Sequence, residues 1–171
     1  MMFRLAEKWG LRPDHSNPCR HIQKYKEQRR ERFLTTEELR RLGQVFASAE
    51  KNNSVYPPII TALRLLIFTG ARLSEILTLK WDYVDYEKQC LHLPDSKTGS
   101  KVIHLSPPAA LLLSEIMMIE TNTHVIYKRN RRERLKKIQR SWRDLRKQAK
   151  LEDVRIHDFG TATQAWGLVK V

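Results

Sequence analysis

The chain has 171 residues, 41% hydrophobic and 30% charged, which suffices for one ordinary folded domain with a short appendage. Its 32 Lys and Arg against 19 Asp and Glu give a formal net charge of +13. Such a surplus favours a polyanionic partner, most often nucleic acid, although a generally basic soluble protein is the alternative. The N-terminus lacks the apolar core of a secretion signal, and the most apolar run, 59–68, is too short to span a bilayer, which excludes a membrane-spanning class.

Residues 1–30 are expected to be the end of an N-terminal domain followed by a basic linker, and residues 31–171 a second domain. A short apolar group is followed by Pro13, Pro18 and a basic run that includes Lys24, Arg29 and Arg30. That run is either a solvated stretch or a strap over a phosphate backbone.

The first clear helix is predicted to begin after Thr35, because Thr35 and Glu38 have the spacing of a capping box. Pro57 opens a second helix that is apolar almost all round, so it should lie inside the domain, and Gly70 is placed to end it. The chain restarts at once with a short helix in which Arg72 and Glu75 are three residues apart and close enough to meet.

From residue 90 the pattern alternates, which predicts two strands joined by the turn residues 94–101, with a third short strand near 83–86. Pro107 then starts another helix, and residues 123–129 form a brief extended piece. A long helix is predicted at roughly 131–150, with Leu135, Ile138, Trp142 and Leu145 on its buried side. The predicted fold class is therefore α+β and mainly α, with a small antiparallel sheet of two or three strands.

The last predicted helix has a strongly basic exterior. Between Lys128 and Lys147 the chain has eleven Lys or Arg and two acidic residues. Such a run is often only a solvated face, but the net charge of +13 favours contact with DNA phosphates. The candidate contacts are Lys101, at the end of the predicted turn, and four residues of this run: Arg131, Arg132, Lys136 and Arg140.

Three other side chains are candidates for chemistry. Arg72 lies in an apolar neighbourhood, so we expect it to be buried and to hold either Glu75 or an anionic ligand; the planar guanidinium suits phosphate. Lys97 is at the tip of the hairpin, where it is either merely exposed or able to give a proton to a leaving oxygen. His157 opens the closing segment and is either structural or catalytic.

Taken together, three segments in this order resemble the catalytic domain of the tyrosine recombinases, the phage integrase family. They are "FTGARLSEILTLKWDYVD" at 68–85, "LPDSKTGSKVIHLS" at 93–106 and "DVRIHDF" at 153–159. The resemblance covers roughly residues 17–159. It implies that 1–30 is the end of a DNA-clamping domain with its linker and that 31–171 is part of the catalytic domain.

The resemblance also implies a mechanism. Such enzymes cut and rejoin double-stranded DNA through a phosphotyrosine, with no metal or other cofactor. By position, Arg72 matches the first catalytic Arg, Lys97 the hairpin Lys that protonates the leaving 5′ oxygen, and His157 the first residue of the family's H-x-x-R box. Glu75 matches an acidic residue that supports the first Arg. The implied location is the cytoplasm of a bacterial or phage-derived system, in association with the nucleoid.

The chain departs from the family after Phe159. Gly160 stands where the box needs Arg, and the five tyrosines, Tyr25, Tyr56, Tyr83, Tyr86 and Tyr127, all precede the box. We interpret this as truncation within the box, for which a shift of reading frame near codon 159 is our hypothesis. The C-terminal helices of the family would then be missing, so part of 59–68 should be exposed or covered by a partner, and we expect marginal stability or self-association.

Two functions follow from this departure. One is a DNA-binding recombinase fragment that does not cleave. The other is a non-enzymatic module that competes or pairs with an intact integrase. The two cysteines, Cys19 and Cys90, lack metal-site spacing, and we expect them to be reduced thiols.

Overall fold

The computed structural model describes residues 2–20, 22, 23, 25, 32–96, 99–116, 122–128 and 135–159. The chain divides into two compact units, Met1–Arg30 and Glu31–Val171. In the first unit, helix α1 (Met2–Lys8) has no buried residue. The Arg12 guanidinium lies 5.2 Å from the centroid of the Phe3 ring, and the Glu7 carboxylate accepts a hydrogen bond from the Asn17 amide at 2.8 Å. The assignment of this unit to a DNA-clamping domain stays a prediction.

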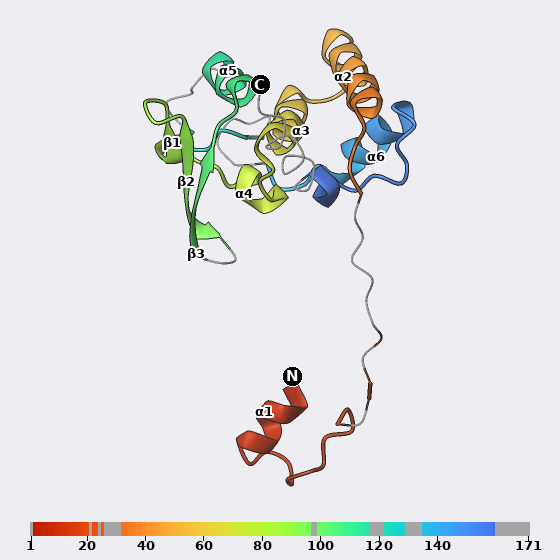
Figure 1. Cartoon of the computed structure of the whole chain (residues 1–171), viewed down its shortest axis with the longest axis vertical. Helices are drawn as coiled ribbons and strands as arrows, with labels where there is room; N and C mark the ends of the chain where they lie inside the picture. The colour runs from red at the N-terminus through yellow and green to blue at the C-terminus, as the bar shows by residue number, and fades with distance from the viewer. Residues whose placement is uncertain are drawn as a thin grey trace. The chain divides into compact units, whose positions relative to one another are not determined.

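The second unit has the predicted α+β fold. Its helices are α2 (Thr36–Lys51), α3 (Pro57–Thr69), α4 (Leu73–Leu77), α5 (Pro107–Glu115) and α6 (Gln139–Gln148), with the 3-10 turns η1 (Trp81–Tyr83) and η2 (Ile156–Asp158) (Figure 1). Within the described ranges, no helix is long and apolar enough to cross a membrane.

Local sequence signals set the helix ends. The Thr35 hydroxyl accepts from the Glu38 amide at 3.2 Å, while the Glu38 carboxylate accepts from the Thr35 amide at 2.8 Å, so the predicted capping box is present. Gly70 ends α3 in the left-handed conformation at φ 62°, where glycine carries no steric penalty. This tight ending turns the chain directly into α4.

A three-stranded antiparallel sheet lies beside the helices, in the order β1 (Val84–Asp85), β2 (Cys90–Ser96) and β3 (Gly99–His104). The predicted hairpin and the third short strand are thus both present. Asp85 pairs with Cys90, and Cys90 in turn pairs with His104. In place of the predicted extended piece, residues 123–128 have an isolated bridge between Lys80 and His124, with the Val125 amide donating to the Leu79 carbonyl at 2.9 Å.

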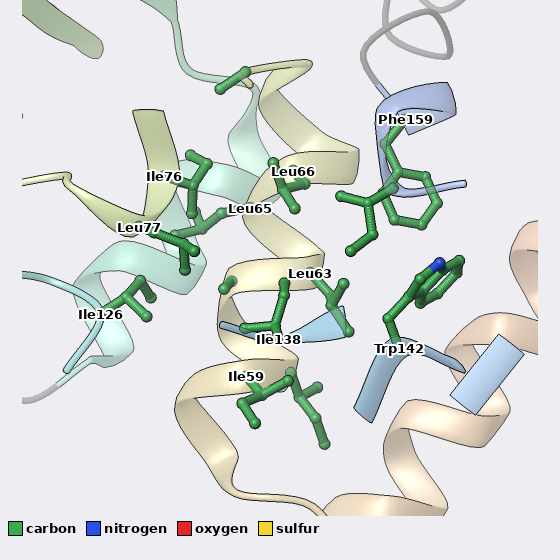
Figure 2. Close-up of a cluster of buried hydrophobic side chains, with 14 of the residues drawn as sticks. Ile59, Leu63, Leu65, Leu66, Ile76, Leu77, Ile126, Ile138, Trp142 and Phe159 are labelled. Carbon is green, nitrogen blue, oxygen red and sulfur yellow. The ribbon is translucent and has the colours of Figure 1, made fainter. Parts of the chain in front are cut away.

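Helix α3 runs through the centre of the core. Figure 2 shows Ile59 and Leu63 of α3 in one buried cluster with Trp142 and Phe159, whose rings meet edge to face at a centroid distance of 5.0 Å. Most of the run 59–68 is buried, namely Ile59, Ile60, Ala62, Leu63, Leu65 and Leu66, and Ile67 and Phe68 at its end are only partly buried. The part of this run that is left accessible is therefore small. The described helices α2, α5 and α6 pack around this central helix. Its end borders a pocket of about 540 Å³, lined by Ile67 and Phe68 among others.

Helix α6 begins later than the sequence suggests. Residues 135–138 are not helical, and the Leu135 amide instead donates to the Ile126 carbonyl at 3.1 Å. This tertiary contact overrides the good helix propensity of the Lys- and Arg-rich sequence. The predicted buried side is otherwise correct, because Ile138, Trp142 and Leu145 are all buried.

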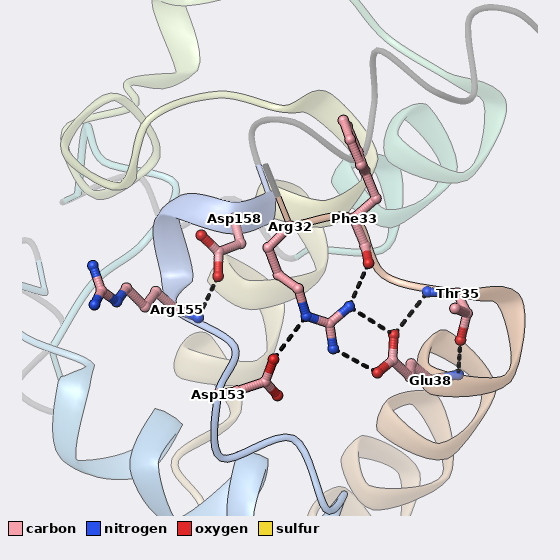
Figure 3. A network of polar contacts seen from close by, with 7 residues as sticks. All are labelled: Arg32, Phe33, Thr35, Glu38, Asp153, Arg155 and Asp158. Atoms are coloured by element: carbon pink, nitrogen blue, oxygen red, sulfur yellow. Dashed lines mark hydrogen bonds and ion pairs between the residues drawn. The ribbon is translucent and has the colours of Figure 1, made fainter. Parts of the chain in front are cut away.

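One arginine connects the start of α2 to the segment that leads into η2. The Arg32 guanidinium donates to both carboxylate oxygens of Glu38, at 2.6 and 3.1 Å, and to Asp153 at 2.8 Å; it also contacts the Phe33 carbonyl (Figure 3). The hydrogen bonds from Arg32 lower the pKa of Glu38 to about 2. Because Asp153 is four residues before His157, this cluster holds the candidate segment against α2.

Candidate functional site

Arg72 and Glu75 form the pair that their spacing predicts. Arg72 lies in extended conformation just before α4. The Glu75 carboxylate accepts from the Arg72 amide at 2.8 Å and from its guanidinium at 3.0 Å. The expected burial of Arg72 is wrong, because its side chain is 44% exposed and that of Glu75 only 5%. The carboxylate is therefore the buried member of the pair, while the guanidinium reaches solvent.

Lys101 approaches the same carboxylate from the sheet. Its ammonium lies 3.4 Å from a Glu75 oxygen, and its side chain is 35% exposed. A buried carboxylate needs charged or hydrogen-bonding partners, and here Arg72 and Lys101 supply them. The arrangement places two cations on one anion, so it carries a net positive charge and fixes β3 relative to α4. Two cations held this way can bind oxygens of a phosphate.

Lys97, the hairpin candidate, lies outside the described residues. The strands on both sides of it are described, and Ser96 pairs with Gly99. Lys24, Arg29, Arg30, Arg131 and Arg132 also lie outside the described residues. Lys136 and Arg140 are both exposed, the first before α6 and the second on its first turn.

His157 is the exposed middle residue of η2, between the buried Ile156 and the half-buried Asp158. The next residue, Phe159, is fully buried against Trp142, which anchors this turn to α6. A hydrogen bond also holds the η2 turn, because the Arg155 amide donates to the Asp158 carboxylate at 2.8 Å. The turn therefore exposes the His157 imidazole to solvent, while Phe159 fixes the backbone of the turn against α6.

The imidazole borders an open pocket of about 230 Å³. Its lining residues are Leu73, Gln139, Trp142, Arg143, Arg146, Arg155, Ile156 and His157. Leu73 directly follows Arg72, so the beginning of α4 and the η2 turn meet here. The lining contains three arginines and no acidic residue, a composition that suits an anion.

The sequence-based reasoning did not select these three arginines. Arg143 and Arg146 are one helical turn apart on α6, and Arg155 is two residues before His157. Arg146 also has a structural contact, a 2.9 Å hydrogen bond to the Val154 carbonyl. The three-residue spacing of Arg143 and Arg146 already places them on one face of a helix. Only the packing of α6 against η2 brings that face beside His157.

Comparison with known proteins identifies the family of the chain. The sequence model of the Phage integrase family matches residues 32–164. The chain belongs to the phage integrase family. The integrase family match includes Arg72, Lys97, Lys101 and His157, and it excludes only the first unit and the last residues.

Curated and solved relatives of this integrase-family chain are longer. A shufflon-specific DNA recombinase of Escherichia coli is 31% identical over 162 residues, which is 92% of this chain and 38% of the relative. The lambda integrase tetramer bound to a Holliday junction aligns with a TM-score of 0.68 at 20% identity, over 99% of this chain and 51% of that one. XerA recombinase aligns with a TM-score of 0.63 at 20% identity, over 82% and 51%. The chain thus spans about two fifths to one half of these proteins, and the solved structures support its fold.

Proposed function

We propose that this chain binds duplex DNA as a phage-integrase-type recombinase fragment. With its present amino-acid sequence it does not cleave that DNA. The observation that carries the proposal is the positively charged surface around Arg72 and His157. Arg72 and Lys101 share the buried Glu75, and the pocket beside His157 adds three arginines with no acidic residue. A surface of this kind fits successive phosphates of one strand.

The family resemblance gives each group a role in this proposal. Arg72 holds non-bridging oxygens of one phosphate, where its charge stabilises the transition state in an intact enzyme. Glu75 orients Arg72 rather than touching DNA. His157 donates to the same phosphate, and Lys97 serves as the proton donor to the leaving oxygen. These roles are carried over by sequence position.

Gly160 supports the cleavage-deficient part of the proposal. The family's box has Arg at this position, and a glycine has no side chain to bind phosphate. Losing one such donor lowers the rate by about 10²–10³. In these 171 residues every tyrosine precedes the box, and the covalent route of the family needs a tyrosine as nucleophile.

Binding is tested with a labelled duplex of random sequence, by fluorescence anisotropy over a range of salt concentrations. Arg143→Gln and Arg155→Gln should each lower the salt dependence of binding by about one phosphate contact. The matched control is Arg40→Gln, which removes the same charge from an exposed side chain paired with Glu37 on α2. If Arg40→Gln weakens binding as much as the other two do, the proposed surface is incorrect.

Cleavage is tested separately with a nicked suicide duplex, which traps a covalent protein–DNA adduct. We expect none, and an adduct would overturn the cleavage-deficient part while leaving DNA binding intact. A second function, competition with an intact integrase, is favoured by the same Gly160. Adding the wild-type chain to an intact family member should then inhibit recombination. If the two proteins compete for DNA, the Arg143→Gln variant should inhibit less than the wild-type chain. Equal inhibition by the variant and the wild type would indicate that the chain pairs with the intact protein.

A further inference from the structure

A group of metal-ligand side chains lies on one face of the small sheet, away from the Arg72 and His157 pocket residues. Asp85 is directly across from Cys90 in the β1–β2 pair, and Cys90 is directly across from His104 in the β2–β3 pair. Side chains of directly opposed residues are on the same face of a sheet, and so is His92, two residues after Cys90. Four side chains of the types that bind transition metals therefore share this face.

Three of the four already converge. The ligand atoms of Asp85, Cys90 and His92 all lie within 4.8 Å of one another. The Cys90 sulfur is 3.3 Å from His92 Nε2, and the same nitrogen is 3.5 Å from an Asp85 oxygen. In a tetrahedral zinc site with the usual metal–ligand bonds, neighbouring ligand atoms are about 3.3–3.7 Å apart. Both measured distances lie in this range before any movement.

The contacts around Asp85 also suit a metal ligand. The Lys88 amide donates to one Asp85 oxygen at 2.8 Å, and the other oxygen faces His92. A hydrogen bond of this kind orients a carboxylate for single-oxygen coordination. The Lys88 ammonium is 3.5 Å from the same oxygen as His92, but it is 75% exposed and can turn into solvent when a cation arrives.

A nucleophilic Cys–His–Asp relay is the other chemistry that these residue types suggest. In such a relay one imidazole nitrogen faces the nucleophile and the opposite nitrogen faces the carboxylate. Here both contacts are made by the same nitrogen, His92 Nε2. The Cys90 sulfur and the Asp85 oxygen both approach the same nitrogen of the His92 ring. This arrangement fits three ligands around one metal ion, and it does not fit a proton relay.

We propose that Asp85, Cys90 and His92 bind a zinc-type divalent transition metal, with His104 as the fourth ligand after a side-chain rotation. Thiolate, imidazole and carboxylate are the ligands that Zn²⁺ takes in proteins. The ion connects all three strands and stiffens the sheet that presents Lys101 and flanks Lys97. It has no part in the chemistry of the DNA phosphate, so the site and the proposed function stand independently. Cysteine spacing could not reveal it, because the ligands come from three strands and only one is a cysteine.

Co²⁺ titration of the full chain under reducing conditions tests the site, since Co²⁺ reports thiolate ligation by a charge-transfer absorption band. The wild-type chain should show a saturable band at one ion per chain, displaced by Zn²⁺. The control Cys19→Ser, which removes the exposed cysteine of the first unit, should keep the band, and Cys90→Ser should lose it. A band that survives Cys90→Ser, or no saturable band in the wild type, would overturn the proposal.

Because Cys90 is buried, its replacement can disturb folding, and a second set of variants covers that case. His92 is half exposed, so His92→Gln should keep the fold by circular dichroism while weakening Co²⁺ binding at least about tenfold. His15→Gln in the first unit is the matched control and should bind as the wild type does. Zn²⁺ should raise the melting temperature of the control but not of His92→Gln. Equal Co²⁺ affinities in His92→Gln and His15→Gln would refute the site formed by Asp85, Cys90 and His92. An unchanged Co²⁺ affinity in His104→Gln would refute His104 as the fourth ligand.

Discussion

Replacing Glu38 by Gln should remove most of the stabilisation that comes from the Arg32 cluster. The Glu38 side chain is 16% exposed and its pKa falls from 4.5 to about 2, chiefly through its hydrogen bonds to Arg32. A fall of this size corresponds to at most about 3.4 kcal/mol at neutral pH. Screening by the remaining solvent contact reduces the expected loss of unfolding free energy in Glu38→Gln to about 2 kcal/mol.

The pH dependence of this loss has a defined sign. Because the folded-state pKa is lowered, the stabilisation is complete above about pH 5 and disappears as the pH falls toward 2. The difference between wild type and Glu38→Gln should shrink from about 2 kcal/mol at pH 7 to about 1 kcal/mol or less at pH 3. Urea unfolding followed by the fluorescence of the buried Trp142 measures it.

Glu37→Gln is the control for this experiment. Glu37 is the preceding residue of the same helix, and its ion pair with Arg40 is more than half exposed on both sides. We expect little change in stability from this variant. The reasoning fails if Glu38→Gln is no more destabilising than Glu37→Gln, or if its effect is the same at pH 7 and pH 3.

Three further substitutions test other parts of the structure. Phe159→Ala should lower the unfolding free energy by about 3–5 kcal/mol in urea titrations, because the ring is fully buried against Trp142; a loss below about 1 kcal/mol would contradict that packing. Gly70→Ala should cost about 1–2 kcal/mol by the same measurement, since alanine is strained at the positive φ that ends α3, and an unchanged stability would show that the chain does not adopt that turn. Lys101→Met should destabilise the chain and weaken anisotropy-measured binding to duplex DNA, since it removes a cation from the buried Glu75; binding at wild-type strength would exclude Lys101 from the DNA-contacting surface.

Local chemistry explains why much of the fold could be predicted. The capping box of Thr35 and Glu38, the terminating Gly70 and the turn-rich hairpin each depend on a few neighbouring residues. The start of α6 could not be predicted in this way. Leu135 bonds to Ile126, and that contact exists only after the core has formed.

In the candidate site, too, local spacing predicts some contacts, while others depend on tertiary packing. The spacing of Arg72 and Glu75 predicts their contact, but it cannot tell which of the two is buried. The arginines beside His157 belong to α6 and to the segment before η2, and only packing brings them together. The cysteine spacing likewise conceals the group of Asp85, Cys90 and His92, because strand register places these side chains on one face.

The ion pair between Arg32 and Asp153 joins residues 121 positions apart, and α2 also packs against α6. At about 5–20 residues per second, roughly 6–24 seconds separate the synthesis of Arg32 from that of Asp153. Throughout that interval, Leu42 and Phe46, which are buried in the finished fold, have no completed surface to cover them. The order of translation therefore makes the docking of the last-made segment the step that completes the cover of the first-made helix.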